Sequence, residues 1–128
     1  MNEGEPEAAF VDVPSMVIVT AEKQDAELVR KGPREGVDSG EAIVSLRVLH
    51  ASADGAMNAG VWECTPGGWE IVARSDTEVA YILSGRARLT ERGGPAVEIG
   101  PGDTVVLPAG WSGRWDVLET VCKLYVVG

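Results

Sequence analysis

EVAYILSG (residues 78–85) and GDTVVLPAG (residues 102–110) are the two most informative segments of this 128-residue chain. In the first, Glu78, Ala80 and Ile82 lie on one face of an extended chain, because side chains alternate along a β-strand. In the second, an apolar run at 104–107 is closed by Pro-Ala-Gly, and proline and glycine favour turns through their φ angles. Both segments are therefore predicted to be strands that end in turns.

The pattern of these two segments extends over residues 41–128. Short runs rich in Val, Ile, Leu, Trp and Tyr alternate with Gly- and Pro-containing turns about every eight to twelve residues, as in β-sandwiches and barrels. The predicted strands cover residues 42–50, 57–65, 70–73, 78–84, 86–91, 96–99, 104–107, 113–118 and 121–127. The sequence thus predicts an all-β domain with a closed or double-sheet topology.

The spacing within both segments resembles the two motifs of the cupin family. Glu78 is followed by six residues and Gly85, and Gly102 is followed by five residues, Pro108, one residue and Gly110. The flanking stretches GVWECTPGGWEI (60–71) and PAGWSGRWDVLETVCKLYVV (108–127) resemble small cupins related to the ureidoglycine aminohydrolase domain and to ethanolamine-utilisation cupins. The resemblance implies a cupin (RmlC-like) jelly-roll barrel over 41–128, preceded by an extension over 1–40.

The chain departs from the cupin pattern at the metal-binding histidines. The resemblance implies two histidines shortly before Glu78 and a third soon after Gly110, but IVARSDT (71–77) and WSGR (111–114) stand there, and His50 is the one histidine of the chain. Transition metals need several imidazole or carboxylate ligands with open positions for substrate. We therefore predict no metal and no cofactor. A metalloenzyme that uses Glu78 with Cys64 or Glu63 is the alternative.

The candidate site follows from the same resemblance. Glu78 is the candidate catalytic residue and polar anchor, with a structural ion pair or hydrogen bond as the competing interpretation. The candidate ligand-binding residues are Trp62, Cys64, Tyr81 and Trp115, although alternation places Tyr81 on the face opposite Glu78. Trp115 is expected to fill part of the former metal space, and core packing explains each tryptophan equally well. Lys123 is expected to pair with Glu119 or Glu63.

Composition limits the partners and the compartment. The formal net charge of -9 argues against nucleic acid and against an anionic membrane surface. Residues 1–10 are acidic and unlike a signal peptide, and no apolar run is long enough to cross a membrane. We therefore expect a cytoplasmic protein with reduced cysteines. Within the extension we expect a poorly ordered acidic leader over 1–15, an edge strand at 16–19 and a helix over 20–31.

Three functions from different classes fit the sequence. The first is a metal-independent cupin that binds, or acts on, a small molecule inside its barrel. The second is a metal-dependent hydrolase or isomerase of the ureidoglycine aminohydrolase type, and the third is a non-catalytic structural or regulatory cupin. Val79, Tyr81 and Leu83 form an apolar stripe on the predicted outer face, from which we expect a two-fold symmetric homodimer.

Overall fold

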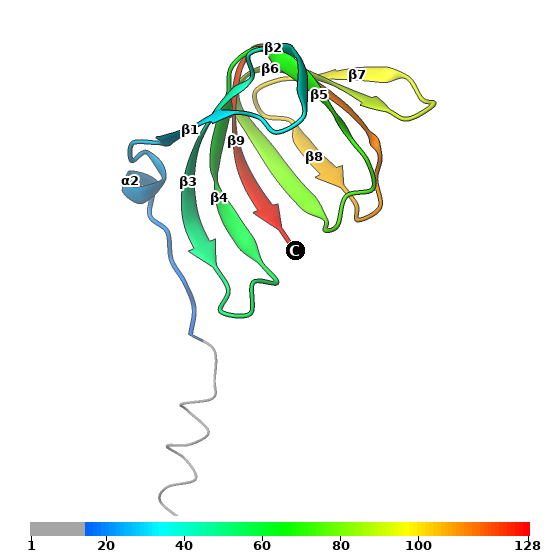
Figure 1. Ribbon diagram of the computed structural model, residues 1–128. Coiled ribbons are helices and arrows are strands. Elements are labelled where there is room, and N and C mark those ends of the chain that lie inside the picture. The colour runs from blue at the N-terminus through cyan, green and yellow to red at the C-terminus, as the bar shows by residue number, and fades with distance from the viewer. Residues whose placement is uncertain (1–14) are drawn as a thin grey trace, which may run out of the picture.

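Residues 15–128, which the computed structural model describes, form nine antiparallel strands that curl into a half-barrel (Figure 1). In chain order the strands are β1 (Val29–Pro33), β2 (Val37–Gly40), β3 (Ile43–Ala51), β4 (Asn58–Cys64), β5 (Gly67–Ile71), β6 (Glu78–Glu91), β7 (Ala96–Ile99), β8 (Thr104–Leu107) and β9 (Gly113–Val127). Helix α2 (Ala21–Gln24) has four residues, and no helix in this range is long and apolar enough to cross a membrane. The all-β prediction is confirmed.

Two long strands, β6 and β9, organise the sheet. They pair with each other from Glu78↔Val127 to Glu91↔Gly113, and each changes its other neighbour halfway along. On β9 that neighbour is β5 for the first half and β4 for the second, while on β6 it is β8 and then β7. The sheet continues from β4 to β3 and β1, and from β5 to β2. We call the concave side of the curled sheet, which Figure 1 shows, the hollow face.

The strand at 78–91 and the strand at 113–127 were each predicted as two strands, and this division is wrong. The register shifts between Ile82 and Ala87 instead of ending, and Gly85 within this irregular stretch has φ +83°. A glycine at positive φ lets a β-bulge bend a strand without breaking its pairing. Both strands therefore bend and continue, and the strands predicted at 96–99 and 104–107 have the predicted bounds.

The sheet begins before residue 41. Strand β1 pairs with β3 and strand β2 pairs with β5, so residues 29–40 belong to the sheet. The helix expected over 20–31 stops at Gln24, because from Val29 onward the backbone hydrogen-bonds to β3, and tertiary pairing overrides helix propensity. Residues 16–19 form no strand. The predicted acidic leader falls largely on residues 1–14, which lie outside the described residues.

The core lies on the hollow face, where the inward side chains of the strands meet. On β6 the residues Glu78, Ala80 and Ile82 are buried while Val79 and Tyr81 are exposed, which confirms the predicted alternation. The buried cluster comprises Ala42, Val44, Cys64, Trp69, Ile82, Ala87, Leu89, Ile99, Leu107, Trp115, Val117 and Val121. One end of this face is not filled by the cluster, and the candidate site lies there.

Candidate functional site

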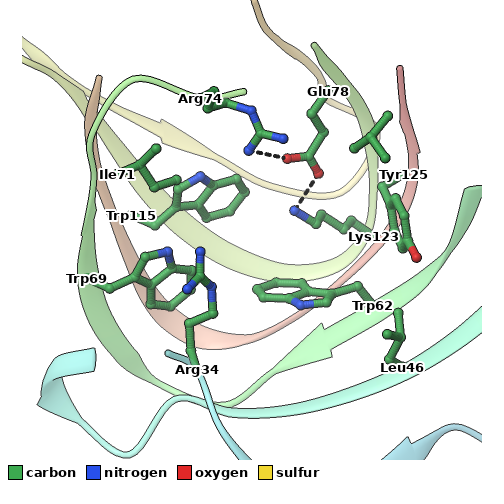
Figure 2. Close-up of a pocket in the computed structure, with 11 residues that line it drawn as sticks. Arg34, Leu46, Trp62, Trp69, Ile71, Arg74, Glu78, Trp115, Lys123 and Tyr125 are labelled. Carbon is green, nitrogen blue, oxygen red and sulfur yellow. Dashed lines mark ion pairs between the residues drawn. The ribbon is translucent and has the colours of Figure 1, made fainter. Parts of the chain in front are cut away.

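A cavity of about 200 Å³ opens on the hollow face of the sheet (Figure 2). Its walls are aromatic and aliphatic, with four charged side chains among them. The lining residues are Arg34, Leu46, Trp62, Trp69, Ile71, Arg74, Glu78, Trp115, Lys123, Tyr125 and Val127. A concave apolar site with a small number of converging polar groups is the usual form of a small-molecule site.

Three tryptophans, Trp62, Trp69 and Trp115, which we call the tryptophan trio, form the aromatic wall. Trp69 and Trp115 are a cross-strand pair of β5 and β9, and their rings are stacked at 5° with centroids 6.1 Å apart. Trp62 of β4 meets both rings edge-on, at 6.1 and 6.2 Å. Offset and edge-to-face contacts at these distances are favourable beyond the area that they bury. The trio is thus a preformed aromatic cluster, in which Trp69 and Trp115 are each 2% exposed and Trp62 is partly buried.

Beside the trio lies an ion-pair cluster of Glu78, Arg74 and Lys123, which we call the Glu78 cluster (Figure 2). The Lys123 Nζ lies 2.6 Å from one carboxylate oxygen of Glu78, and an Arg74 nitrogen lies 3.2 Å from the other. The side chains of Glu78 and Lys123 are only 7% and 8% exposed. Glu78 therefore lies in the cavity wall, and two cations bind its carboxylate.

Lys123 is further held by aromatic faces. Its Nζ lies 4.3 Å from the ring centroid of Trp62 and 4.5 Å from that of Trp115, within the range of a cation–π interaction. Burial lowers the pKa of Lys123 below its usual value, and the nearby Glu78 carboxylate opposes that shift. The expected pairing of Lys123 with Glu119 or Glu63 is wrong, because residues 115, 117, 121 and 123 share the inward face of one continuous strand.

Two arginines reach the cavity from connecting segments. Arg74 lies between β5 and β6, where its backbone exchanges hydrogen bonds with Trp111 and Gly110, and its side chain also pairs with Asp76 at 2.9 Å. Arg34 lies between β1 and β2, and its guanidinium is 5.3 Å from the ring centroid of Trp69. The extension that the sequence set apart from the barrel therefore supplies part of the cavity wall.

The structure brings some of the predicted residues together and separates others. Glu78, Trp62 and Trp115 line the cavity. Tyr81 does not, because it is on the opposite face of β6 and is 46% exposed, and Cys64 is completely buried in the core. Burial raises the pKa of the Cys64 thiol to about 11. Only three of the five candidates therefore meet at one place.

The cavity residues that were not predicted from the sequence include Lys123, Arg34, Arg74, Trp69 and Tyr125. Lys123 and Tyr125 stand an even number of residues after Trp115, so on one continuous strand they lie on the same face as Trp115. The strand break that was predicted at 119–120 concealed this relation. Trp69 falls between the predicted strands 57–65 and 70–73, but it lies in β5 as the cross-strand partner of Trp115. The two arginines lie in irregular segments, where no periodicity indicates the direction of a side chain.

Residues 51–125 match the model of the EutQ-like cupin domain, which is more than half of the chain. The chain belongs to the EutQ-like cupin family. No curated protein matches it.

Solved structures share the fold of this EutQ-like cupin at low sequence identity. A DUF861-family protein of unknown function from Pseudomonas syringae pv. tomato has a TM-score of 0.74 at 23% identity, covering 82% of this chain. This chain spans only 46% of that protein. The match to a putative ethanolamine utilization protein Q from Salmonella typhimurium (TM-score 0.59, 22% identity) covers 93% of that protein and 79% of this chain. The match to a predicted oxalate decarboxylase from Thermotoga maritima (TM-score 0.66, 17% identity) covers 97% of that protein and 87% of this chain.

The residues of this EutQ-like cupin do not fit the metal that many cupins bind. Glu78 is the one carboxylate among the residues that line the cavity, and both its oxygens are held by cations. Cys64 does not line the cavity, and Glu63 is on the other face of β4. Within residues 15–128 no group of three or more His, Cys, Asp or Glu side chains is placed to hold a metal ion. A further cation beside Lys123 would meet electrostatic repulsion.

Proposed function

We propose that this EutQ-like cupin is a metal-independent small-molecule-binding protein whose ligand occupies the cavity that the tryptophan trio and the Glu78 cluster line. The observation that supports this most directly is the cavity of about 200 Å³, which remains although three tryptophans line it. Had the tryptophans filled the barrel, a purely structural role would be favoured. The aromatic wall supplies apolar contact, and the charged cluster supplies orientation.

The site is also suited to proton transfer, which leaves room for an enzyme. Glu78 and Lys123 are hydrogen-bonded at 2.6 Å in the wall of the cavity, and such a pair can exchange a proton with a bound molecule. Binding is the common requirement of both roles, so the proposal and its test concern binding.

The first prediction is that small ring compounds bind in this cavity. In a fragment screen followed by the indole N–H signals in NMR spectra, compounds that bind should shift the signals of Trp62, Trp69 and Trp115. The signal of Trp111, which does not line the cavity, should stay in place. A screen in which no compound shifts the three cavity signals at millimolar concentration would contradict the proposed function.

A matched pair of substitutions locates the binding. Ile71→Phe adds volume at a cavity-lining position and should weaken every binder, because the ring takes up ligand space. Val72→Phe adds the same ring one residue later, at a position that is 68% exposed, and should leave binding unchanged. Equal effects of the two substitutions would place the binding site elsewhere.

A further inference from the structure

The charges of the cavity are unlike those of the whole chain. The chain has a formal net charge of -9, yet the residues that line the cavity include three cations, Arg34, Arg74 and Lys123, and one carboxylate, Glu78. Even with Asp76, which pairs with Arg74 at the edge of the cavity, the cations remain in excess. Clefts of one sign with low-dielectric walls concentrate ligands of the opposite sign.

Arg34 differs from the other two cations of the cavity in its contacts. Lys123 and Arg74 are held by Glu78, whereas Arg34 makes no ion pair with any carboxylate in the described part of the chain. Its guanidinium donates one hydrogen bond, to the carbonyl oxygen of Glu35 at 2.6 Å, and lies over Trp69. Arginine has five N–H donors arranged to bind a carboxylate through two parallel hydrogen bonds.

The ligand that fits these charges is an anion. Arg34 offers guanidinium donors that no carboxylate among residues 15–128 binds, and the cations that line the cavity outnumber its carboxylate. Both observations favour a ligand rich in acceptor oxygens.

Resting on the proposed function, we propose that the ligand is a small planar carboxylate. Its carboxylate would bind the guanidinium of Arg34, and its flat body would lie beside Trp62, the member of the tryptophan trio that is only partly buried.

The size of the cavity and its walls limit the body of this ligand. A volume of about 200 Å³ corresponds to about seven water molecules at the density of the liquid, which is below the size of most drug-binding sites. One ring with a carboxylate fits that volume. The partly buried ring of Trp62 favours a flat partner, because π-systems pair best when stacked or edge-on.

The test uses three probes of one shape and three charges. Benzoate, benzamide and benzamidinium are isosteric and carry charges of minus one, zero and plus one. Titrated into the full-length protein and followed by the indole signals, benzoate should bind about tenfold more tightly than benzamide, and benzamidinium most weakly. Acetate, which lacks the ring, should bind more weakly than benzoate.

Substitutions at one arginine assign the preference to the proposed contact. Arg34→Gln should reduce the affinity for benzoate to that for benzamide, and Arg34→Lys should retain most of the preference because it retains the charge. Arg86→Gln is the control, since Arg86 pairs with Glu98 outside the cavity and its side chain is 46% exposed. A melting temperature measured for each variant shows that its fold is intact.

The outcomes separate the two proposals. If all three probes shift the cavity signals with equal affinity, or if benzamidinium binds most tightly, the carboxylate proposal is wrong and small-molecule binding stands. A benzoate preference that survives Arg34→Gln would also overturn the assigned contact. If no probe and no fragment shifts these signals, both proposals fail.

Discussion

At the Glu78 carboxylate, two protein cations stand where the cupin pattern implies a metal ion. Burying a carboxylate alone is costly, and a cation at close range with good hydrogen-bond geometry offsets that cost. The Lys123 ammonium provides this at 2.6 Å, and Arg74 supplies the second contact. Because these cations are side chains of the protein, the Glu78 carboxylate has its counter-ions as soon as the chain has folded.

The dependence of Glu78 and Lys123 on each other gives a stability prediction. Glu78→Gln leaves Lys123 as a buried charge without its partner and should lower the free energy of unfolding by about 3–5 kcal/mol. The double variant Glu78→Gln with Lys123→Met removes both charges and should recover much of this loss. Urea denaturation of the variants measures the effect. Glu98→Gln, which changes an exposed ion pair with Arg86 and Arg88, should stay close to wild type.

If Glu78→Gln unfolds like wild type while it loses benzoate binding, Glu78 acts on the ligand and not on the fold. A double variant that is less stable than Glu78→Gln would also contradict the prediction, because it would show that Lys123 stabilises the core by some contact other than its ion pair.

The thiol of Cys64 should be inert in the folded protein. Its pKa is raised to about 11 by burial, so at pH 8 only about one thiol in a thousand is ionised, and the thiolate is the reactive form. In Cys122→Ser, labelling by iodoacetamide at pH 8 should be slow for the folded chain and fast in urea. The pKa of Cys64 is higher in the folded chain than the usual value of 9.0, so the neutral buried thiol contributes its full stabilisation below pH 9. As the pH rises from 9 toward 11, the thiol ionises in the unfolded chain first, and the free energy of unfolding falls. Rapid labelling of the folded chain would contradict the prediction.

Among the strands, the bend of β6 against β9 shapes the hollow face. The bend occurs where the register shifts, and Gly85 lies within it at φ +83°. A Cβ built on Gly85 would collide with the carbonyl oxygen of Thr120 and would lie 2.6 Å from the Cα of Val121. The two backbones thus approach at a distance that only glycine permits.

Gly85→Ala should therefore destabilise the protein by about 3 kcal/mol, because it combines a left-handed backbone with a collision against backbone atoms. Gly93→Ala is the matched control. Gly93 has φ +73°, but no atom lies within 4 Å of the added Cβ, so only the cost of the left-handed conformation applies, about 1–2 kcal/mol. Thermal melts compare the two. Equal losses would show that the close approach at Gly85 has no energetic weight.

The predictable part of the fold was the part governed by alternation and by turn residues. Residues 96–99 and 104–107 have the predicted bounds because turns containing glycine and proline limit both strands. Gly85 misled the prediction because a glycine that permits a bulge has the same sequence signal as one that ends a strand. In the site, alternation and the cupin spacing predicted the inward Glu78. Arg34 was not predictable, because its place depends on β1 and β2 joining a sheet distant in sequence.

Considered as a whole, the molecule has an apolar outer face. Val79, Tyr81 and Leu83 are 41–46% exposed on β6, and Val106, which pairs with Val79, is 59% exposed on β8. The chain has a net charge of -9, so two copies repel each other overall, and the repulsion is weakest where uncharged surfaces meet. These four positions are uncharged, and a two-fold axis would place them against their counterparts.

The homodimer expected from the sequence remains a prediction and can be tested by light scattering. Wild type at micromolar concentration should give twice the chain mass of 13.5 kDa. Tyr81→Lys should give the monomer, since a two-fold axis places the two new charges close together. Val72→Lys, at an exposed position outside the stripe, should remain dimeric. A monomeric wild type would overturn the prediction.

The cavity is divided between parts of the chain that differ in their importance for folding, and this affects how the protein can evolve. The tryptophan trio lies in β4, β5 and β9, so replacing any of its members disturbs the core of the sheet. Arg34 lies in a three-residue connection between β1 and β2, and connections tolerate replacement. Descendants of this chain can therefore acquire new ligand preferences by mutation at 34–36 while the stacked rings are inherited unchanged.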